Sequence, residues 1–563
     1  MLFLPYLCRK IIISQKKRIM KILWLDLNSS YAHSSLALPA LHAQMAHRTD
    51  VEWKVVSATI NEQTGMIVDN ICRHRPDVLA ATTWLFNHEA LMHITSRAKA
   101  LLPHCCLILG GPEFLGDNEA FLRRNPWVDA VFRGEGEEQF PRWVDVWNSR
   151  EEWTEIQGLC YLDANGQYHD QGLARVMDFA SLTPPETSPF FNWSKPFVQL
   201  ETTRGCFNTC AFCVSGGEKP VRTLSIEAIR QRLQMIDAHG ICNIRVLDRT
   251  FNYNPRRARA LLELFKQYPH IRFHLEIHPA LLSEELKQLL QEAPEGLLHL
   301  EAGIQSLRQP VLDQCRRAGK LTDALEGLNF LCSLSNMETH ADLIAGLPLY
   351  KLEEIFEDVR TLAAYEAGEI QLESLKLLPG TEMRRRAAEL GICYAPMPPY
   401  EVLQTREISV EELQVARRLS RLLDEFYNTP AWQKLTRRLI LHDENFLHGF
   451  LAYLTNGNYI DQPMSLEKRG WLLYCYCKDA YPTFRTEASI AWIEAGMSLK
   501  KEPAERVRTR RQTPPEHWEV LNGSYKESLR LCFLPTDAEG LHGYWFGYES
   551  EIQKNAPVFK ARS

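Results

Sequence analysis

The sequence lacks any run of about 18 apolar residues, the length that a membrane-spanning helix needs, so we expect no transmembrane segment. It also lacks an excess of basic residues, because 64 Lys and Arg stand against 70 Asp and Glu for a net charge of -6. That balance gives no long-range attraction to a phosphate backbone, which argues against a general nucleic-acid binder. Internal repeats and low-complexity tracts are absent too. With 563 residues and 45% hydrophobic composition, the chain is long enough for two or three globular domains.

Cysteine is frequent, but few of the cysteines have a spacing that indicates a binding site. Of 15 cysteines, only one group has a tight spacing that indicates chemistry. The apolar stretch at residues 1–8 lacks the preceding basic region of a secretory signal, so we expect a reducing, cytoplasmic compartment. Met20 stands directly before a strand-like run. We therefore expect residues 1–19 to be a disordered leader, with Met20 as an alternative start of translation.

Strand-like apolar runs alternate with helical patterns from residue 20 to about residue 150. The runs lie at residues 22–27, 51–58, 78–83, 106–110 and 128–132. Continuous apolar strands separated by helices predict a parallel, doubly wound sheet of the Rossmann type. Ligands of such sheets bind at the carboxyl ends of the strands, which here are followed by the loops at residues 28–33, 82–86, 110–113 and 133–137.

A connector and a second alternation follow. Residues 151–197 are expected to join the domains, because four prolines fall between residues 178 and 197. Residues 198–395 contain six strand candidates with helices between them, which predicts a partial (β/α)6 barrel of the TIM type. The candidates are residues 198–203, 243–247, 272–277, 297–302, 339–345 and 370–377. Residues 396–563 are expected to form a mostly helical C-terminal domain after these two α/β domains.

The clearest chemical signal is Thr203-Arg-Gly-Cys206-Phe-Asn-Thr-Cys210-Ala-Phe-Cys213, directly after the first strand of the second alternation. Three thiolates with this spacing can bind one iron-sulfur cubane if the loop curls tightly, and Gly205 favours the turn. Three protein ligands leave one iron free to bind another molecule. Cys242 precedes the second strand, so we expect it at the opposite end of the barrel, badly placed to close the cluster.

Two other interpretations of the three cysteines are open at this point. They could bind zinc with a distant fourth ligand, or they could be ordinary buried thiols. A structural zinc site normally brings paired C-x-x-C elements or a histidine partner at matching spacing, and neither is evident. The spacing therefore favours a 4Fe-4S cluster.

This spacing, with Phe212 directly before the last cysteine, resembles the signature of the radical S-adenosylmethionine (radical SAM) superfamily. The resemblance implies a partial TIM barrel whose cluster loop follows the first strand. It also implies that Cys206, Cys210 and Cys213 hold a 4Fe-4S cluster whose open iron binds S-adenosylmethionine. Electron transfer into the sulfonium would then yield methionine and a 5'-deoxyadenosyl radical. The implied partner is an electron donor such as flavodoxin or ferredoxin.

The later strands of the predicted barrel also look like that family. Polar residues at the carboxyl ends of barrel strands face the active site. We therefore expect Asp248, Glu276, Glu301 and Gln305 to bind the methionine or ribose parts of the cofactor. Each of them, taken alone, could equally be a loop cap or a surface residue.

The first domain resembles cobalamin-binding domains. Thr83-Trp-Leu85 and the pair Gly110-Gly111 look like the elements that let the backbone approach the nucleotide tail of cobalamin, which makes Thr83, Leu85, Gly110 and Gly111 the expected contacts. The D-x-H-x-x-G element that supplies a cobalt-ligating histidine in many cobalamin enzymes is absent, and His33 does not fit it. The resemblance therefore implies cobalamin without a histidine on the lower face of cobalt. A Rossmann-like domain that binds no ligand is the alternative.

Taken together, residues 20 to about 395 resemble the cobalamin-dependent radical SAM enzymes, and the tail resembles an uncharacterised domain often attached to them. The implied reaction is methylation of an unactivated carbon with methylcobalamin as the donor, or else a cyclisation or rearrangement, of an unknown substrate.

One rival is an RNA methylthiotransferase, although the first domain has only Cys72, Cys105 and Cys106 for a second cluster. The basic run at residues 506–511 could touch RNA, but a solvated loop is the commoner explanation. The other rival is a non-catalytic, cobalamin-responsive sensor.

Overall fold

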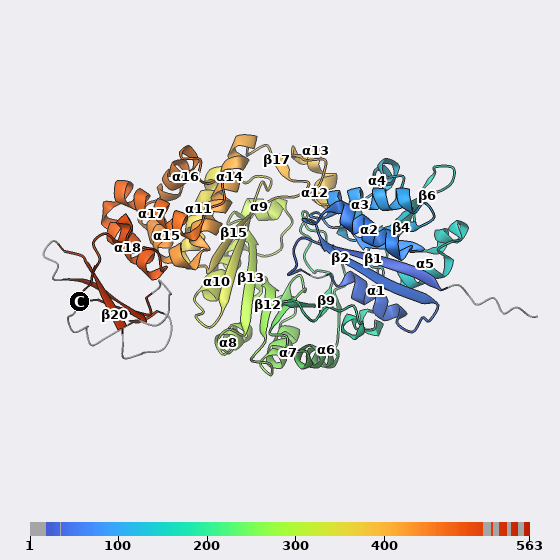
Figure 1. The fold of residues 1–563 in the computed structure, drawn as a ribbon, viewed down its shortest axis with the longest axis horizontal. Helices are drawn as coiled ribbons and strands as arrows, with labels where there is room; N and C mark the ends of the chain where they lie inside the picture. The colour runs from blue at the N-terminus through green and yellow to red at the C-terminus, as the bar shows by residue number, and fades with distance from the viewer. Residues whose placement is uncertain are drawn as a thin grey trace, which may run out of the picture.

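Three folded units follow one another along an elongated molecule in the computed structural model (Figure 1). The structure describes residues 19–33, 35–509, 519–521, 529–537, 542–549 and 557–562. The first unit is blue in Figure 1, the second is green to yellow, and the third runs from orange to red. The expected leader at residues 1–19 lies outside the described residues except for Ile19.

The first unit is a sheet covered by helices on both faces. Its parallel strands are β1 (Met20–Asn28), β2 (Val51–Thr59), β3 (Val78–Thr82), β4 (Cys106–Gly110) and β5 (Ala130–Phe132), in the order β2-β1-β3-β4-β5. The helices are α1 (Ala37–Met45), α2 (Thr64–His74), α3 (His88–Leu101), α4 (Glu119–Arg124) and α5 (Gln139–Val146). Alternate strand residues fill two separate cores, with Leu23 in one and Trp24 in the other. The prediction of a Rossmann-type sheet is confirmed. Strands of such a sheet are buried on both faces, which is why they are marked by apolar runs in the sequence.

The predicted connector was wrong in part. Residues 159–170 form a hairpin of β6 (Leu159–Leu162) and β7 (Tyr168–Asp170), which extends the first sheet beyond β5 with antiparallel pairing. The sequence carried a signal for this hairpin, since Asn165-Gly166 sits between two short strand-like runs and Gly166 adopts a φ of 76°. The first unit therefore continues past residue 150, and the proline-rich segment follows the hairpin.

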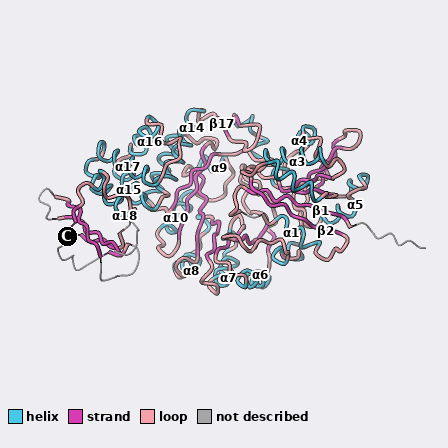
Figure 2. The backbone as a smooth tube through the Cα atoms, in the orientation of Figure 1, coloured by secondary structure: helices cyan, strands magenta, loops and turns pink. Residues whose placement is uncertain are grey.

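The second unit is a six-stranded parallel sheet that curves into an open barrel. Its strands are β8 (Val198–Leu200), β11 (Asn243–Val246), β12 (Arg272–Ile277), β13 (Leu298–Gln305), β14 (Glu338–Ala345) and β15 (Glu369–Ser374), and they pair in chain order. The helices between them are α6 (Ile226–Ala238), α7 (Pro255–Phe265), α8 (Glu284–Gln291), α9 (Gln309–Gln314), α10 (Leu321–Cys332) and α11 (Leu352–Ala364). The six predicted strands are confirmed, and the two strand-rich units are visible in magenta in Figure 2.

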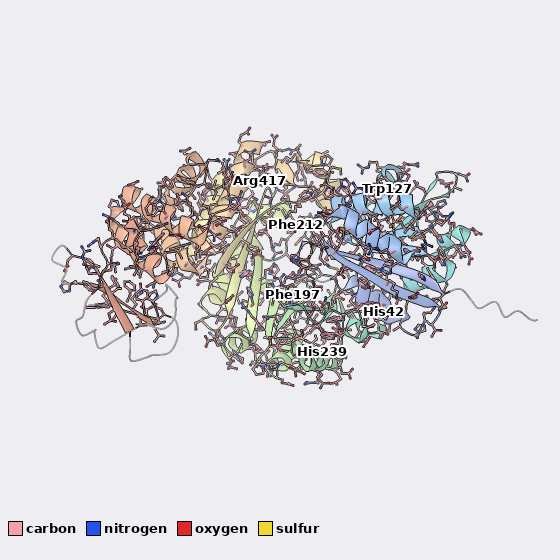
Figure 3. The ribbon with its side chains drawn as sticks, viewed as in Figure 1. His42, Trp127, Phe197, Phe212, His239 and Arg417 are labelled. Atoms are coloured by element: carbon pink, nitrogen blue, oxygen red, sulfur yellow. The ribbon has the colours of Figure 1, made fainter. Side chains whose placement is uncertain are left out.

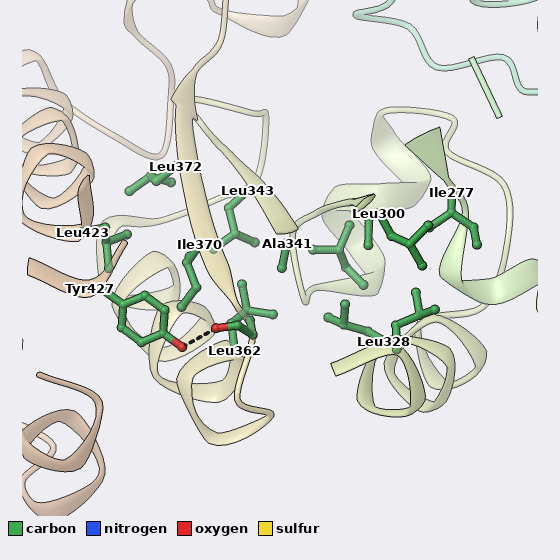
Figure 4. Close-up of a cluster of buried hydrophobic side chains, with 14 of the residues drawn as sticks. Ile277, Leu300, Leu328, Ala341, Leu343, Leu362, Ile370, Leu372, Leu423 and Tyr427 are labelled. Carbon is green, nitrogen blue, oxygen red and sulfur yellow. Dashed lines mark hydrogen bonds between the residues drawn. The ribbon is translucent and has the colours of Figure 1, made fainter. Parts of the chain in front are cut away.

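Residues of the barrel strands alternate between two environments. Leu300, Ala341 and Ile370 are buried and lie in the large apolar cluster shown in Figure 4. Their neighbours along the strands are polar, and Glu276 pairs in register with Glu301 of the next strand. Because strand side chains alternate between faces, the polar set lies on the face of the sheet away from this core.

The third unit consists mainly of helices. They are α14 (Val410–Leu422), α15 (Pro430–His442), α16 (Phe446–Asn456), α17 (Leu466–Ala480) and α18 (Arg485–Glu494), preceded by α12 (Glu382–Arg385), α13 (Ala387–Leu390), β16 (Cys393–Tyr394) and β17 (Val402–Gln404). The buried Tyr427 anchors these helices to the barrel, since its hydroxyl donates to the Ala367 carbonyl at 2.8 Å (Figure 4).

A small sheet that the sequence analysis did not predict follows the helices. Its strands are β18 (Arg508–Thr509), β19 (Glu519–Val520), β20 (Leu529–Pro535), β21 (Gly543–Glu549) and β22 (Phe559–Arg562), in the order β18-β20-β21-β22-β19. The aromatic segment at residues 544–548, expected within the helical domain, is the centre of β21. Aromatic residues favour strands, so this signal was present. Part of the basic run at residues 506–511 lies outside the described residues.

No helix among the described residues is both long and apolar enough to cross a membrane.

Candidate functional site

The loop that carries the three cysteines is held in a tight curl. It begins after β9 (Thr203–Arg204), which pairs with β10 (Arg222–Thr223), and Gly205 makes the turn with a φ of 90°. The N–H of Cys213 donates to the Cys210 carbonyl at 3.1 Å, and the N–H of Gly216 donates to the Cys213 carbonyl at 3.0 Å. A Cβ on Gly216 would lie 2.3 Å from the Cys210 carbonyl oxygen, so only glycine fits there.

The three thiols influence one another electrostatically, which places them in one neighbourhood. Burial raises the pKa of Cys210 and of Cys213, and the charges of the other cysteines in the loop act in the same direction. Cys206 is half-buried, with its Sγ 3.8 Å from the Thr250 hydroxyl. Within the described residues, no three ligating side chains lie close enough to hold a single metal ion. A cubane binds each thiolate through a different iron, so its ligands stand farther apart.

Two further cysteines bear on the number of ligands. Cys242 is exposed directly before β11, whose amino end is opposite the edge that carries the loop. Cys315 lies near Cys210, and the sequence analysis missed it because about a hundred residues separate the two in sequence. Its thiol is 1% exposed within the apolar core, and burial raises its pKa to about 12. A thiol in that environment resists the deprotonation that iron binding requires.

The predicted residue Asp248 lies beneath the cysteine loop. Its side chain is buried, and Oδ1 accepts from the N–H groups of Thr202 and Thr203 at 2.9 Å each. The Thr202 hydroxyl donates to the other oxygen. These contacts give Asp248 a role in holding the start of the loop, and its predicted contact with the cofactor stays a prediction.

The predicted pair Glu276 and Glu301 shares the polar face of the barrel. Burial raises the pKa of Glu276 to about 7, while the Arg249 guanidinium, 3.9 Å away, acts in the opposite direction. Glu301 lies 2.8 Å from Nε2 of His274, which lowers the pKa of that carboxyl. Gln305 ends β13 at a bulge with a φ of 70°. Gln305 thus lies at the carboxyl end of β13 and Glu276 close to the carboxyl end of β12, whereas Glu301 lies in the middle of β13.

A cleft of about 820 Å³ joins the first unit to the barrel. From the first unit it is lined by Gly110 and Gly111 and by the loop at residues 134–137, and from the barrel by residues 203–205 and Arg249. The cleft continues as a slot between the sheet and α1, where small residues leave room: Ala37, Ala40, Ala80 and Ala81. The glycine pair and the start of the cysteine loop therefore face a common cavity, and Phe212 lies between the two units in Figure 3.

Of the residues in the first unit that are predicted to contact cobalamin, some line the cleft and others lie behind its wall. Gly110 and Gly111 line the cleft, and a Cβ on Gly111 would lie 2.6 Å from the Thr83 carbonyl oxygen. Thr83 is fully buried behind this turn, and its hydroxyl has no hydrogen-bond partner. Leu85 is half-buried and does not line the cleft, whereas its neighbour Trp84 does and is 37% exposed. The sequence prediction named Thr83 and Leu85 of this loop but not Trp84.

Ion pairs connect the two walls of the cleft. Arg222 donates to both carboxylate oxygens of Glu135 at 2.7 Å, and its side chain is only 8% exposed. Arg204, inside the cysteine motif, donates to Glu137 at 2.6 Å. Sequence reasoning placed residues 133–137 at the ligand edge but did not predict these partners, because they come from the other unit.

Matches to known protein families cover both walls of the cleft. Residues 200–362 match the model described as the radical SAM superfamily, and residues 26–144 match the B12 binding domain. Residues 388–491 match a protein of unknown function (DUF4080). The chain thus joins a B12 binding domain to a radical SAM domain, the combination found in the cobalamin-binding radical SAM proteins. The cofactors of this class are a 4Fe-4S cluster, S-adenosylmethionine and cobalamin.

Relatives of this radical SAM protein cover most of its length at low identity. An uncharacterized methyltransferase of Pyrococcus horikoshii is 23% identical over 74% of the chain and 91% of that relative. The cobalamin-dependent radical SAM methyltransferase TokK of Streptomyces tokunonensis is 23% identical. The match covers 58% of the chain and 51% of TokK. A tRNA-2-methylthio-N(6)-dimethylallyladenosine synthase of Leifsonia xyli is 23% identical over 61% of the chain and 60% of that relative.

The fold is also that of a solved enzyme. The cobalamin-dependent radical enzyme OxsB, with aqua-cobalamin and S-adenosylmethionine bound, aligns with a TM-score of 0.60 over 84% of this chain and 79% of its own at 14% identity. At this identity the likeness is one of fold.

The residues of this radical SAM protein fit the cofactors of its class. The curled loop offers three thiols, and the nearest further thiol, Cys315, is packed in the core. The slot beside Gly111 is lined by small and apolar side chains, and the buried Thr83 hydroxyl behind the turn has no partner. A flat aromatic base, such as the nucleotide tail of cobalamin, suits such a slot.

Proposed function

We propose that this protein is a cobalamin-dependent radical SAM methyltransferase, acting on an unactivated carbon of a substrate yet to be identified. The observation that carries the proposal is the shared cleft, in which the Gly110-Gly111 turn faces the start of the cysteine loop. Bound together, the cofactors supply a carbon-centred radical and a methyl group. A site for both must bring them to one substrate, and a cavity between two domains is where such sites commonly lie.

The protein's own part in this chemistry is positioning. Cys206, Cys210 and Cys213 would hold the cluster, and the Asp248 carboxylate fixes the start of their loop. Glu276, Glu301 and Gln305 would orient S-adenosylmethionine along the polar face of the barrel. The Glu135–Arg222 pair keeps the first domain in place against the barrel. We infer that the reductant is a small electron-transfer protein such as flavodoxin or ferredoxin, and that the protein works in the cytoplasm.

The rival assignment as an RNA methylthiotransferase is disfavoured by the cysteines of the first domain. Cys105 and Cys106 contribute to opposite faces of the first sheet, since they belong to different apolar cores. Burial raises the pKa of Cys105 to about 12. Cys72 lies on α2, beside the core that contains Cys105. Side chains on opposite faces of a sheet cannot bind one cluster.

The test is anaerobic purification with cobalamin supplied, followed by quantitation of iron, sulfide and corrinoid. We expect about four irons per chain, as in other 4Fe-4S proteins, and one corrinoid. Replacement of Cys206, Cys210 and Cys213 by alanine should remove the iron and leave the corrinoid, because the slot lies in the other domain. Iron retained by that variant would contradict the proposal.

Two measurements separate the remaining alternatives. Reduced, reconstituted protein should form 5'-deoxyadenosine from S-adenosylmethionine, whereas a sensor that does not turn over would not. Gly111→Val should lose corrinoid and keep iron, because a side chain there collides with the Thr83 carbonyl. Gly65→Ala is the matched control, since a Cβ at Gly65 meets no atom within 4 Å.

A further inference from the structure

A turn of the barrel runs directly alongside the cysteine loop. It comprises residues 315–318, between α9 and α10. The Cys315 carbonyl accepts from the N–H of Ala211 at 2.8 Å, and the Arg316 carbonyl accepts from the Thr209 hydroxyl at 3.3 Å. The N–H of Ala318 donates to the side chain of Asn208 at 3.0 Å. The turn therefore binds the cysteine loop at three successive points, although it is distant in sequence.

Arg317 makes a fourth contact, and this one reaches a predicted ligand atom. Its Nη1 lies 3.8 Å from the Sγ of Cys210, within hydrogen-bonding distance of a sulfur. Its Nη2 donates to the Gly303 carbonyl, which belongs to the bulge near the end of β13. The Arg317 backbone N–H donates to the Leu312 carbonyl at 2.9 Å. The backbone of Arg317 and the Nη2 end of its guanidinium are thus held by carbonyl groups, and the Nη1 end lies beside the sulfur.

The surroundings of Arg317 allow its positive charge to act strongly on the Cys210 sulfur. The Arg317 side chain is half-buried, and Cys210 is 7% exposed, so water screens the contact only partly. The neighbouring His278 is 5% exposed, and neither of its ring nitrogens has a hydrogen-bond partner. Burial and the nearby Arg317 lower the pKa of His278 to about 3, so that ring stays neutral. The adjacent Arg316 differs, because its side chain is 54% exposed and pairs with Glu382 at 2.5 Å.

We propose that Arg317 is a positioning residue that holds Cys210 in the cluster loop through an N–H···S hydrogen bond and raises the reduction potential of the cluster. Hydrogen bonds to the sulfurs, together with net charge, set the potentials of iron-sulfur clusters. Reduction adds a negative charge to the cluster, and a fixed cation beside one ligand stabilises the reduced form. The inference rests on the proposed function only in requiring that the three cysteines bind a cluster.

The test compares three variants of the full chain after anaerobic reconstitution. Arg317→Met removes the donor and the charge, Arg317→Lys keeps a charge with fewer donors, and Arg316→Met is the matched control from the same turn. The midpoint potential of the cluster is measured by dithionite titration followed by electron paramagnetic resonance. We expect Arg317→Met to have a more negative potential than wild type, Arg317→Lys to lie between the two, and Arg316→Met to match wild type.

The possible outcomes separate the inference from the function it rests on. A loaded Arg317→Met variant with the wild-type potential overturns the inference and leaves the proposed function intact. If Arg317→Met loses iron while Arg317→Lys keeps it with a lowered potential, the inference stands. Loss of the cluster from both variants overturns it, because the retained charge of lysine would then have no effect. A wild-type chain without any cluster overturns the proposed function and the inference together.

Discussion

At the scale of single residues, the raised pKa of Glu276 on the polar face of the barrel predicts how stability changes with pH. Burial raises its pKa to about 7, against about 4.3 for an unperturbed glutamate. The folded chain therefore binds a proton more tightly than the unfolded chain does. The stability that this proton confers is fully present below about pH 4 and is lost as the pH rises through about 7.

Glu276→Gln should therefore reduce the pH dependence of stability. We expect the unfolding temperature of the metal-free wild-type chain to fall between pH 5 and pH 8, and that of the variant to fall less. Some fall should persist, because burial and the neighbouring Glu301 raise the pKa of Asp342 to about 7 as well. Thermal unfolding across this pH range checks the prediction. Equal slopes for both proteins would show that Glu276 does not titrate there.

Residue-level prediction from the sequence was strongest for local patterns. The three cysteines and the Gly110-Gly111 pair could be proposed as site residues because residue type and spacing alone single them out in the sequence. Arg317 and Cys315 could not be found, because they reach the cysteine loop only through the folding of distant segments. Asp248 was placed correctly at the strand end, but no sequence pattern reveals that two backbone N–H groups and a hydroxyl already occupy its carboxylate.

At the scale of elements, the cysteine loop depends on a glycine that is not part of the sulfur pattern. A Cβ on Gly216 would collide with the Cys210 and Cys213 carbonyl oxygens at 2.3 Å and 3.0 Å. Gly216→Ala should therefore force the loop open and lower iron from about four per chain to less than one, while corrinoid binding is retained. Iron and corrinoid assays after reconstitution check this. Gly65→Ala should behave as wild type, and a fully loaded Gly216→Ala would refute the account of the curled loop.

The strands and helices of the two α/β units were predictable because each buried strand is a continuous or alternating apolar run. The β6–β7 hairpin was missed although Asn165-Gly166 marks its turn, since a hairpin of such short strands gives little periodicity. The C-terminal sheet was missed because helical patterns dominate the residues before it. Its aromatic strand β21 pairs with β20 and β22, which lie on either side of it in the sequence.

At the scale of the whole molecule, the Glu135–Arg222 pair connects the cobalamin-binding domain to the stem of the cysteine loop. Both side chains are largely buried, at 19% and 8% exposed. Replacement of Glu135 weakens two charge-assisted hydrogen bonds from Arg222, each worth about 1.5 kcal/mol, although Arg222 keeps its ion pair with Glu218 at 2.8 Å. Glu135→Gln should therefore loosen both walls of the cleft at once. We expect faster amide hydrogen exchange at residues 134–137 and at residues 203–206.

The control for this prediction is Glu119→Gln. Glu119 pairs with Arg123 on a surface helix, where both side chains are at least 43% exposed. Surface pairs of this kind contribute about 0.5 kcal/mol or less, so exchange in the cleft should be unchanged. Faster exchange on one wall only, in Glu135→Gln, would show that the pair does not couple the two domains.

The central claim is that three cysteine sulfurs of one loop hold a 4Fe-4S cluster in which one iron has no protein ligand. Electron paramagnetic resonance of the reduced, reconstituted protein, recorded with and without S-adenosylmethionine, tests it most directly. We predict the signal of a single 4Fe-4S cluster that changes when S-adenosylmethionine is added, and no signal from the variant with all three cysteines replaced. A signal that S-adenosylmethionine leaves unaltered, or zinc in place of iron in the wild-type loop, would contradict it.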